Sequence, residues 1–163
     1  MLRLPAFRFL QPTTIDEAVA FLAEDPGNTR LVAGGTDLWP NMKRRHQGAG
    51  TVVSLRGIEE LCGIEEADDG GLVIGATTTL DTITDDERVQ QRYPALVTAV
   101  ASISSPLLRN AGTIGGNLCL DTRCTYYNQN EEWRRSIDYC MKEEGEICWV
   151  APSRPRCWAG SSG

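Results

Sequence analysis

The chain has 163 residues, 41% of them hydrophobic, so it is long enough for one compact domain or two small lobes. It carries 16 Lys and Arg against 22 Asp and Glu, and this net charge of −6 disfavours a general attraction to nucleic acid. No apolar run approaches the roughly 18 residues of a membrane span, and residues 1–10 lack the apolar core of a secretory signal. We therefore expect a cytoplasmic protein with no nucleic-acid and no membrane partner.

The first 56 residues alternate between helix and strand signals. Thr14 followed three positions later by Glu17 is a capping pattern. Periodicity predicts, in chain order, a helix over residues 14–25, a strand over 30–33, a helix through 45 and a strand over 51–55. Residues 1–56 are therefore expected to form a small lobe of α/β type.

The next section, residues 57–120, reads as the start of a second lobe. Its signals predict a hairpin with strands over 61–67 and 72–76, helices from 79 to 103, and a glycine-rich turn over 112–117. Beyond Leu120 the periodicity disappears, and charged residues, cysteines and tryptophans take over. Residues 121–158 are therefore interpreted as an insertion, and residues 159–163 as a tail.

Six cysteines in a chain without an export signal favour metal, cluster or redox chemistry over disulfides, because reducing cytosol keeps thiols unpaired. Cys62 and Cys119 lie in apolar contexts and are expected to be small buried residues. The single histidine, His46, argues against catalytic triads and multi-histidine metal sites. It ends the basic run Lys43–His46, which fits an acidic partner or a phosphate, but more simply a solvated helix end.

Two glycine-rich turns are candidate anion-binding sites. Residues 32–37 offer consecutive backbone N–H groups at a strand end, with no Cβ at Gly34 and Gly35 to block close approach. Residues 112–117 repeat the arrangement, so two cradles can face one elongated dinucleotide. Either turn alone is equally well explained as a tight turn. Neither fits a Rossmann or a P-loop motif, and Thr77 can either touch the same ligand or cap a helix.

The remaining four cysteines fall in the insertion with the spacing C-x15-C-x7-C-x8-C. Four thiolates form a complete ligand set for an iron–sulfur cubane or for zinc, and a loop without a core of its own needs such a staple to become ordered. On residues alone, both metals stay open, and unligated thiols are a third possibility. The residues concerned are Cys124, Cys140, Cys148 and Cys157.

Read with their flanks, residues 31–38 and 109–118 resemble the paired FAD-binding motifs of molybdenum hydroxylase flavoprotein subunits, the family of xanthine dehydrogenase and carbon monoxide dehydrogenase. The resemblance implies an α+β fold with α/β-like lobes, namely a two-lobed PCMH-type FAD-binding domain, truncated here and carrying a cysteine-rich inserted loop. It implies FAD-binding residues at Leu31, Val32, Ala33, Gly34, Gly35, Thr36, Asp37, Leu38, Thr77, Ile103, Thr113, Ile114, Gly115, Gly116 and Asn117. No side chain is expected to act as a catalytic acid or base.

The inserted loop resembles that of the 4-hydroxybenzoyl-CoA reductase branch of the family, in which such a loop holds an extra 4Fe–4S cluster. The four cysteines of the insertion match its ligands. By resemblance, reduced ferredoxin would donate electrons that pass from this cluster to FAD, then to a 2Fe–2S small subunit and a molybdopterin-binding large subunit. The alternatives are the FAD subunit of an NAD-linked xanthine-type dehydrogenase and a zinc-stapled interaction module without redox activity. In this family the rest of the second lobe and a C-terminal domain would follow.

Overall fold

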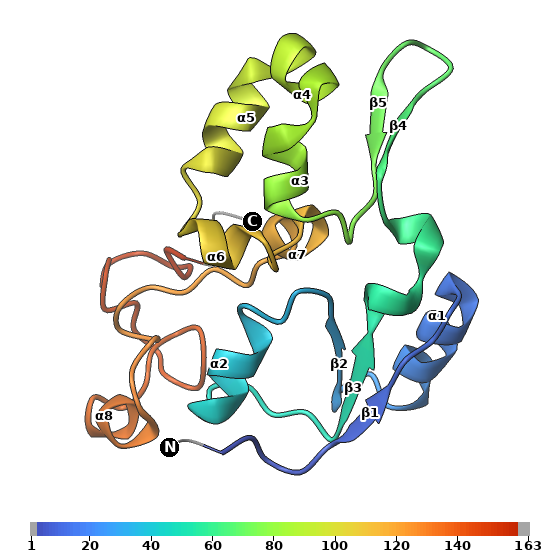
Figure 1. Cartoon of the computed structure of the whole chain (residues 1–163). Helices are drawn as coiled ribbons and strands as arrows, with labels where there is room; N and C mark the ends of the chain where they lie inside the picture. Colours follow the sequence, from blue (N-terminus) through green and yellow to red (C-terminus); the bar gives the residue numbers. More distant parts are fainter. Residues whose placement is uncertain (1–2, 160–163) are drawn as a thin grey trace.

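A computed structural model describes residues 3–159, and it places a parallel sheet at the centre of the N-terminal part (Figure 1). The sheet has three strands in the order β1-β3-β2, and helices α1 and α2 connect them along the chain. The bounds are β1 (Arg8–Leu10), α1 (Ile15–Glu24), β2 (Thr29–Val32), α2 (Leu38–Lys43) and β3 (Thr51–Ser54). The helices and strands from α1 to β3 confirm the predicted order, with ends shifted by one or two residues, whereas β1 was not predicted.

Local signals and burial together explain this part of the chain. The Thr14 side chain accepts a hydrogen bond from the N–H of Glu17, and the Glu17 carboxylate accepts one from the N–H of Thr13. Val52 and Val53 of the central strand are both fully buried, so they pack on opposite faces of the sheet. One face packs with α2 and the other with α1.

The second part contains a hairpin and three helices. Two 3₁₀ turns, η1 (Leu55–Gly57) and η2 (Glu59–Leu61), lead to the antiparallel pair β4 (Ile64–Glu66) and β5 (Leu72–Ile74). The helices are α3 (Leu80–Asp85), α4 (Glu87–Arg92) and α5 (Pro94–Ala101). Their buried residues, Leu80, Ile83, Val89 and Val100, form a separate core cluster against the hairpin. The hairpin is confirmed, and Thr79 caps α3 where the sequence predicted a helix start.

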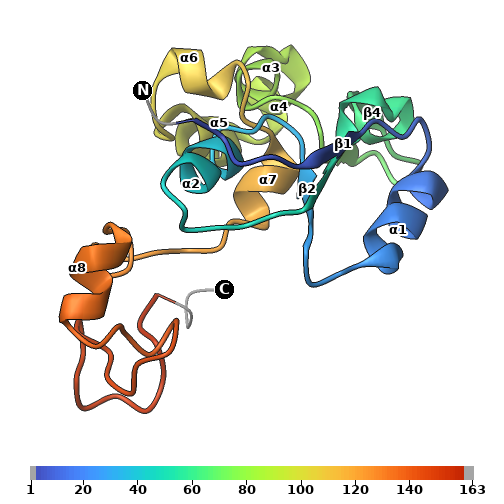
Figure 2. The same cartoon turned by 90° about the horizontal axis from the view of Figure 1, so that it is seen from below.

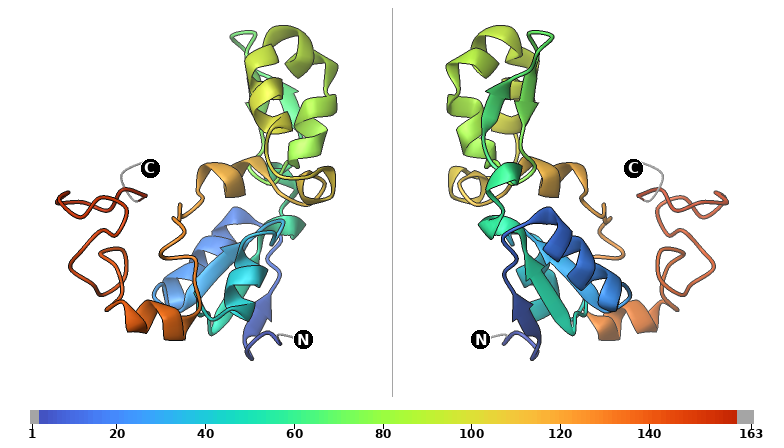
Figure 3. Two further views of the ribbon diagram at one scale, coloured as in Figure 1. Left: turned by 90° about the vertical axis from the view of Figure 1, so that its left-hand side faces the viewer. Right: turned by 90° about the vertical axis from the view of Figure 1, so that its right-hand side faces the viewer.

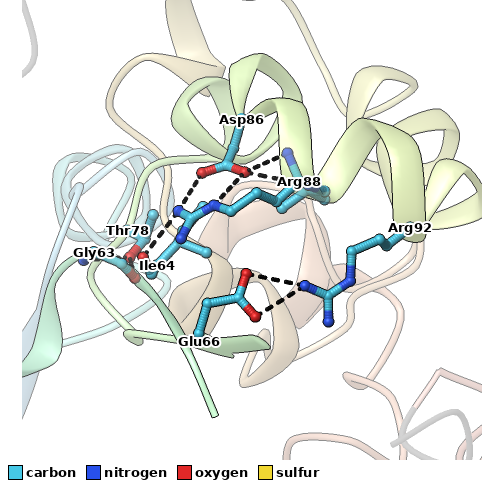
Figure 4. A network of polar contacts seen from close by, with 8 residues as sticks. Gly63, Ile64, Glu66, Thr78, Asp86, Arg88 and Arg92 are labelled. Atoms are coloured by element: carbon cyan, nitrogen blue, oxygen red, sulfur yellow. Dashed lines mark hydrogen bonds and ion pairs between the residues drawn. The ribbon is translucent and has the colours of Figure 1, made fainter. Parts of the chain in front are cut away.

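Polar contacts fasten the hairpin to α4 (Figure 4). The carboxylate of Asp86 caps α4 and binds the guanidinium of Arg88, which also donates to the carbonyl of Ile64 at 3.0 Å. Arg92 forms an ion pair with Glu66 on the same strand. These two contacts join strand β4 to helix α4 at the edge of the second core cluster.

Helices α6 (Pro106–Arg109) and α7 (Ile114–Leu118) lie between the two groups of elements (Figure 1). The core residues of the two groups fall into separate clusters on either side of the η2 turn. Ile58 and Leu61 belong to the cluster of the first part, so the cores divide a few residues after position 56, and the boundary between residues 1–56 and 57–120 stays a prediction. Cys62 and Cys119 are exposed, so the expectation that they are buried is wrong. Within residues 3–159 no helix is long and apolar enough to cross a membrane.

The segment after residue 120 leaves the two groups and projects away from them, mostly as a series of turns (Figures 2 and 3). It contains one helix, α8 (Glu131–Ser136), which Asn130 caps through its side chain. We call residues 121–159 the cysteine loop. The expected tail after residue 159 lies outside the described residues.

A buried arginine organises the cysteine loop. The side chain of Arg134 is only 3% exposed, and it binds the carboxylates of Glu131 at 2.8 Å and Glu143 at 2.5 Å. Its guanidinium also lies 5.5 Å from the centre of the Tyr127 ring. A segment with few buried apolar residues is thus held by charge, and its stability depends on keeping both carboxylates paired.

We expect Arg134→Gln to destabilise the cysteine loop by about 1–3 kcal/mol, because it removes a buried guanidinium that hydrogen-bonds to two partly exposed carboxylates. The matched control is Arg135→Gln, since Arg135 is the next residue of α8 and its side chain is 72% exposed. Its effect should stay within about 0.5 kcal/mol. The rate of chymotrypsin cleavage within residues 121–159 measures the stability of the loop in both variants. Chymotrypsin cleaves after aromatic residues, so neither substitution removes a cleavage site. Equal cleavage rates in the two variants would contradict the assignment.

Candidate functional site

The first glycine turn joins β2 to α2 and presents unused backbone donors. Gly35 has a φ of 74°, a left-handed conformation that glycine adopts without strain. Within residues 3–159 no hydrogen bond is donated by the consecutive N–H groups of Gly34, Gly35, Thr36 and Asp37. Half-buried N–H groups left unpaired in a turn form a concavity that suits an anion.

The two glycine turns touch backbone to backbone. A Cβ atom on Gly34 would lie 1.8 Å from the carbonyl oxygen of Ala111 and 3.1 Å from the Cα of Gly112. On the other side of this contact, a Cβ on Gly112 would lie 3.5 Å from the hydroxyl of Thr36. Gly34 is therefore required for a reason beyond turn geometry, because any side chain there would push the second turn away.

The second turn differs from the first in its hydrogen bonding. The N–H groups of Ile114 and Gly115 donate to the carbonyls of Thr78 and Ala76, at 3.0 and 2.9 Å. The N–H of Gly116 donates to the buried Thr113 hydroxyl, which caps α7. These donors already have partners within the chain, and the role of the second turn in cofactor binding stays a prediction. Side-chain contacts to a cofactor from Thr113 or Asn117 stay a prediction.

The other predicted cofactor residues occupy varied positions. Val32 is buried, and Leu38 packs against the cluster that contains it, whereas Leu31 is exposed on β2. The hydroxyl of Thr77 donates to the carbonyl of Leu61 at 2.8 Å, so this side chain fixes the base of the hairpin and has only its acceptor lone pairs left. Ile103 packs against the core of the second part.

All four cysteines of the insertion line one cavity. The cavity is small, with a volume of about 10 Å³, and mainly aromatic and aliphatic side chains complete its wall. The structure thus brings together residues that are widely spaced in the sequence and lack any hydrophobic pattern. The lining residues are Cys124, Tyr126, Tyr127, Cys140, Met141, Lys142, Cys148, Trp149, Val150, Cys157 and Ala159.

The surroundings of the Cys140 thiol raise its pKa. Burial raises its pKa, and the neighbouring sulfurs of Cys124 and Cys157 raise it further, because negative charges would repel one another. Backbone hydrogen bonding at Lys142 acts in the opposite direction. Several thiolates in this space therefore need a cation to share their charge, as a bound metal does.

Cys148 has the opposite environment. Backbone hydrogen bonds from Trp158, and then from Ala151 and Val150, lower the pKa of its thiol despite burial. Hydrogen bonds of this kind favour the thiolate, which is the form that binds metals. The turns at residues 148–151 and 157–158 are thus arranged to support a charged sulfur.

The sulfur atoms surround a space but do not converge on a point. Within residues 3–159, no group of three or more His, Cys, Asp or Glu side chains is placed so that it could hold a metal ion. A zinc ion holds its thiolates at about 2.3 Å, so all four must crowd round one centre. In a 4Fe–4S cluster the thiolates bind different irons and stand farther apart. Four thiols around one space are a ligand set that either centre uses.

An ion pair ties the cysteine loop to the first glycine turn. Arg123, whose side chain is 12% exposed, binds both carboxylate oxygens of Asp37 through its two terminal nitrogens. The hydrogen bond to Asp37 raises the pKa of the guanidinium. Arg123 directly precedes Cys124, so the pair fixes the start of the loop against the turn. Sequence reasoning missed both Arg123 and Arg134, because no periodicity or motif marks them.

Comparison with known proteins agrees with this geometry. The family model described as "FAD binding domain in molybdopterin dehydrogenase" matches residues 5–128. The xanthine dehydrogenase FAD-binding subunit of Escherichia coli O157:H7 is 38% identical over 106 residues, which is 65% of this chain and 36% of that one. The carbon monoxide dehydrogenase medium chain of Hydrogenophaga pseudoflava is 38% identical over 114 residues, covering 70% and 39%.

The solved carbon monoxide dehydrogenase from Hydrogenophaga pseudoflava superposes with a TM-score of 0.69 at 36% identity, covering 74% of this chain and 42% of that one. The chain thus spans less than half the length of these relatives. The match confirms the predicted mixed α and β fold of a flavin-binding domain. Both glycine turns fall inside the matched residues, whereas the family model ends before Cys140. The chain belongs to the family of FAD-binding domains found in molybdopterin dehydrogenases.

Proposed function

We propose that this chain carries FAD and a 4Fe–4S cluster in the electron-transfer subunit of a molybdenum enzyme that reductively removes the hydroxyl of 4-hydroxybenzoyl-CoA. The FAD domain follows from the family. The 4Fe–4S cluster, the electron donor and the substrate 4-hydroxybenzoyl-CoA go beyond the family and are proposed here. The observation that carries it is the single cavity lined by four cysteines beside the first glycine turn.

The first glycine turn is the part of the chain suited to the flavin's pyrophosphate. Its four adjacent N–H groups lack partners within the described residues, and its glycines leave no Cβ to hold an anion away. The contact between Gly34 and Ala111 holds this turn against the second one. The chain's contribution is therefore to bind and orient the cofactor, which supplies the one- and two-electron chemistry when bound.

The cysteine loop is suited to hold a cluster. The four thiols face one space and so offer the complete thiolate set of a cubane, and hydrogen bonds favour the thiolate of Cys148. Trp149 also lines the cavity and donates its indole N–H to the carbonyl of Tyr139 at 2.7 Å. This bond fixes an apolar wall that limits water at the sulfurs.

The proposed partners follow from the family and from the loop. A molybdopterin-binding large subunit and a 2Fe–2S small subunit would receive electrons from FAD, and reduced ferredoxin would supply them to the loop cluster. An NAD-linked xanthine-type function is the second candidate, because a relative at 38% identity is a xanthine dehydrogenase subunit. The cysteine loop favours ferredoxin, since NAD reacts with a flavin directly and needs no extra cluster.

A cofactor inventory of the full-length subunit, purified anaerobically in its complex, tests the proposal. We expect one FAD and about four irons with four acid-labile sulfides beyond those of the partner subunits. Zinc with no sulfide would refute the cluster and favour the interaction module. Comparing reduced ferredoxin with NADH as electron donors then separates the two redox candidates.

Gly34→Ala should lower the FAD content of the full-length subunit at least about tenfold, a loss of about 1.4 kcal/mol of binding. The added methyl would meet the Ala111 carbonyl oxygen at 1.8 Å and separate the two turns. Gly48→Ala is the matched control, because a Cβ there meets no atom within 4 Å. The ratio of flavin absorbance to protein gives the measurement, and equal ratios in both variants would count against the cradle.

Cys140→Ser should remove most iron from the loop while flavin content stays unchanged in the full-length subunit. A hydroxyl is a poor ligand for iron, and Cys140 is buried at the cavity. Cys62→Ser is the control, since Cys62 is exposed and lies outside the loop. Iron and sulfide analysis decides the matter, and retention of both in Cys140→Ser would exclude this ligand.

A double-mutant cycle with Arg123→Gln and Asp37→Asn should give a coupling energy of about 1–2 kcal/mol, because charged hydrogen bonds contribute this much when partly shielded from water. Arg123 is largely buried, whereas Asp37 is 40% exposed. Thermal unfolding of the four proteins provides the energies. A coupling near zero would mean that the loop is not fastened to the glycine turn by this pair.

A further inference from the structure

A basic cavity lies between the end of α2 and the cysteine loop. It encloses about 600 Å³ and is open to solvent. Cationic side chains come from the N-terminal segment and from the end of α2, and two amides come from the loop. The lining residues are Arg3, Lys43, Arg44, Arg45, His46, Asn128 and Asn130.

The cations of this cavity are uncompensated. Within residues 3–159, none of Arg3, Lys43, Arg44 and Arg45 forms an ion pair. The whole chain carries a net charge of −6, so this is a local reversal of its overall sign. Four like charges gathered in one hollow repel one another, and a negatively charged partner would relieve that repulsion.

The backbone at the end of α2 fixes the position of Arg45. Arg45 has a φ of 62°, in the left-handed region where glycine usually ends a helix. The N–H of Arg45 bonds to the Met42 carbonyl, and the N–H of His46 bonds to the Asn41 carbonyl, which fixes this conformation. A strained position is thus occupied by an arginine whose side chain lines the cavity.

The basic cavity and the cysteine cavity approach each other at Tyr127 and His46. Tyr127 lines the cysteine cavity, and its ring centre lies 6.4 Å from that of His46, which lines the basic one. A ring nitrogen of His46 also contacts the Gln129 carbonyl of the loop. A partner seated in the basic cavity would therefore lie next to the wall of the proposed cluster site.

We propose that the basic cavity is the docking surface for a small acidic electron-carrier protein that delivers electrons to the cysteine loop. This inference rests on the proposed function. In each encounter the carrier loses one electron and the loop cluster gains it, and no bond is made or broken. A protein fits better than a small anion because Lys43, Arg44 and Arg45 are exposed, and exposed charges steer association over distance. Small-anion sites instead use buried, preorganised donors.

Charge reversal in the full complex tests the docking surface. Arg44→Glu is compared with Arg56→Glu, an exposed arginine on η1 outside the cavity that changes the net charge equally. Titration calorimetry with an acidic ferredoxin at low salt should show Kd raised about tenfold by Arg44→Glu only, with the difference shrinking as NaCl increases. Reduction of the cluster by reduced methyl viologen, which needs no protein docking, should be unchanged in both variants.

Three outcomes would overturn the inference. Equal effects of Arg44→Glu and Arg56→Glu would show that only net charge matters. Loss of a partner subunit in Arg44→Glu would show that the cavity is an interface within the complex. Competition of micromolar pyrophosphate with ferredoxin in the unaltered complex would indicate a small-anion site. The iron and flavin contents of the complex are measured first, and their absence would count against the proposed function. The ferredoxin titration then tests the docking surface by itself.

Discussion

The contact between the backbones of Gly34 and Ala111 is the constraint on which the rest of the site depends. It joins the two parts of the chain where a side chain of any size would separate them. The amides of the first turn have no hydrogen-bond partner among residues 3–159, while those of the second turn are used to hold α7 in place. One turn is therefore shaped to bind, and the other to support it.

Charge takes over the role of an apolar core in the cysteine loop. Arg134 gathers the carboxylates of Glu131 and Glu143 inside the loop, and Arg123 fastens the loop to Asp37. The strength of such ion pairs depends on their geometry and on their removal from water more than on buried apolar area. The loop can therefore be ordered although its sequence has no periodic pattern of hydrophobic residues. The same arrangement sets four sulfurs around one space beside the glycine turn.

The sequence predicted the features that local rules control. The Thr14 cap, the hairpin and the open turn at Gly34 each follow from residue types within a few positions of one another. The engaged amides of the second turn were missed, because their partners Thr78 and Ala76 are distant in the chain. Cys62 was expected to be buried from its apolar neighbours, yet its position after the η2 turn exposes it. Arg123 and Arg134 act through tertiary contacts that no pattern encodes.

Amide hydrogen exchange of the full-length subunit, with and without FAD, tests the central claim most directly. If the first turn grips the pyrophosphate, exchange at residues 34–37 should slow at least about tenfold on flavin binding. Amides 114–117 should change little, because they are already hydrogen-bonded in the chain alone. Protection that appears at residues 114–117 and not at 34–37 would contradict the account.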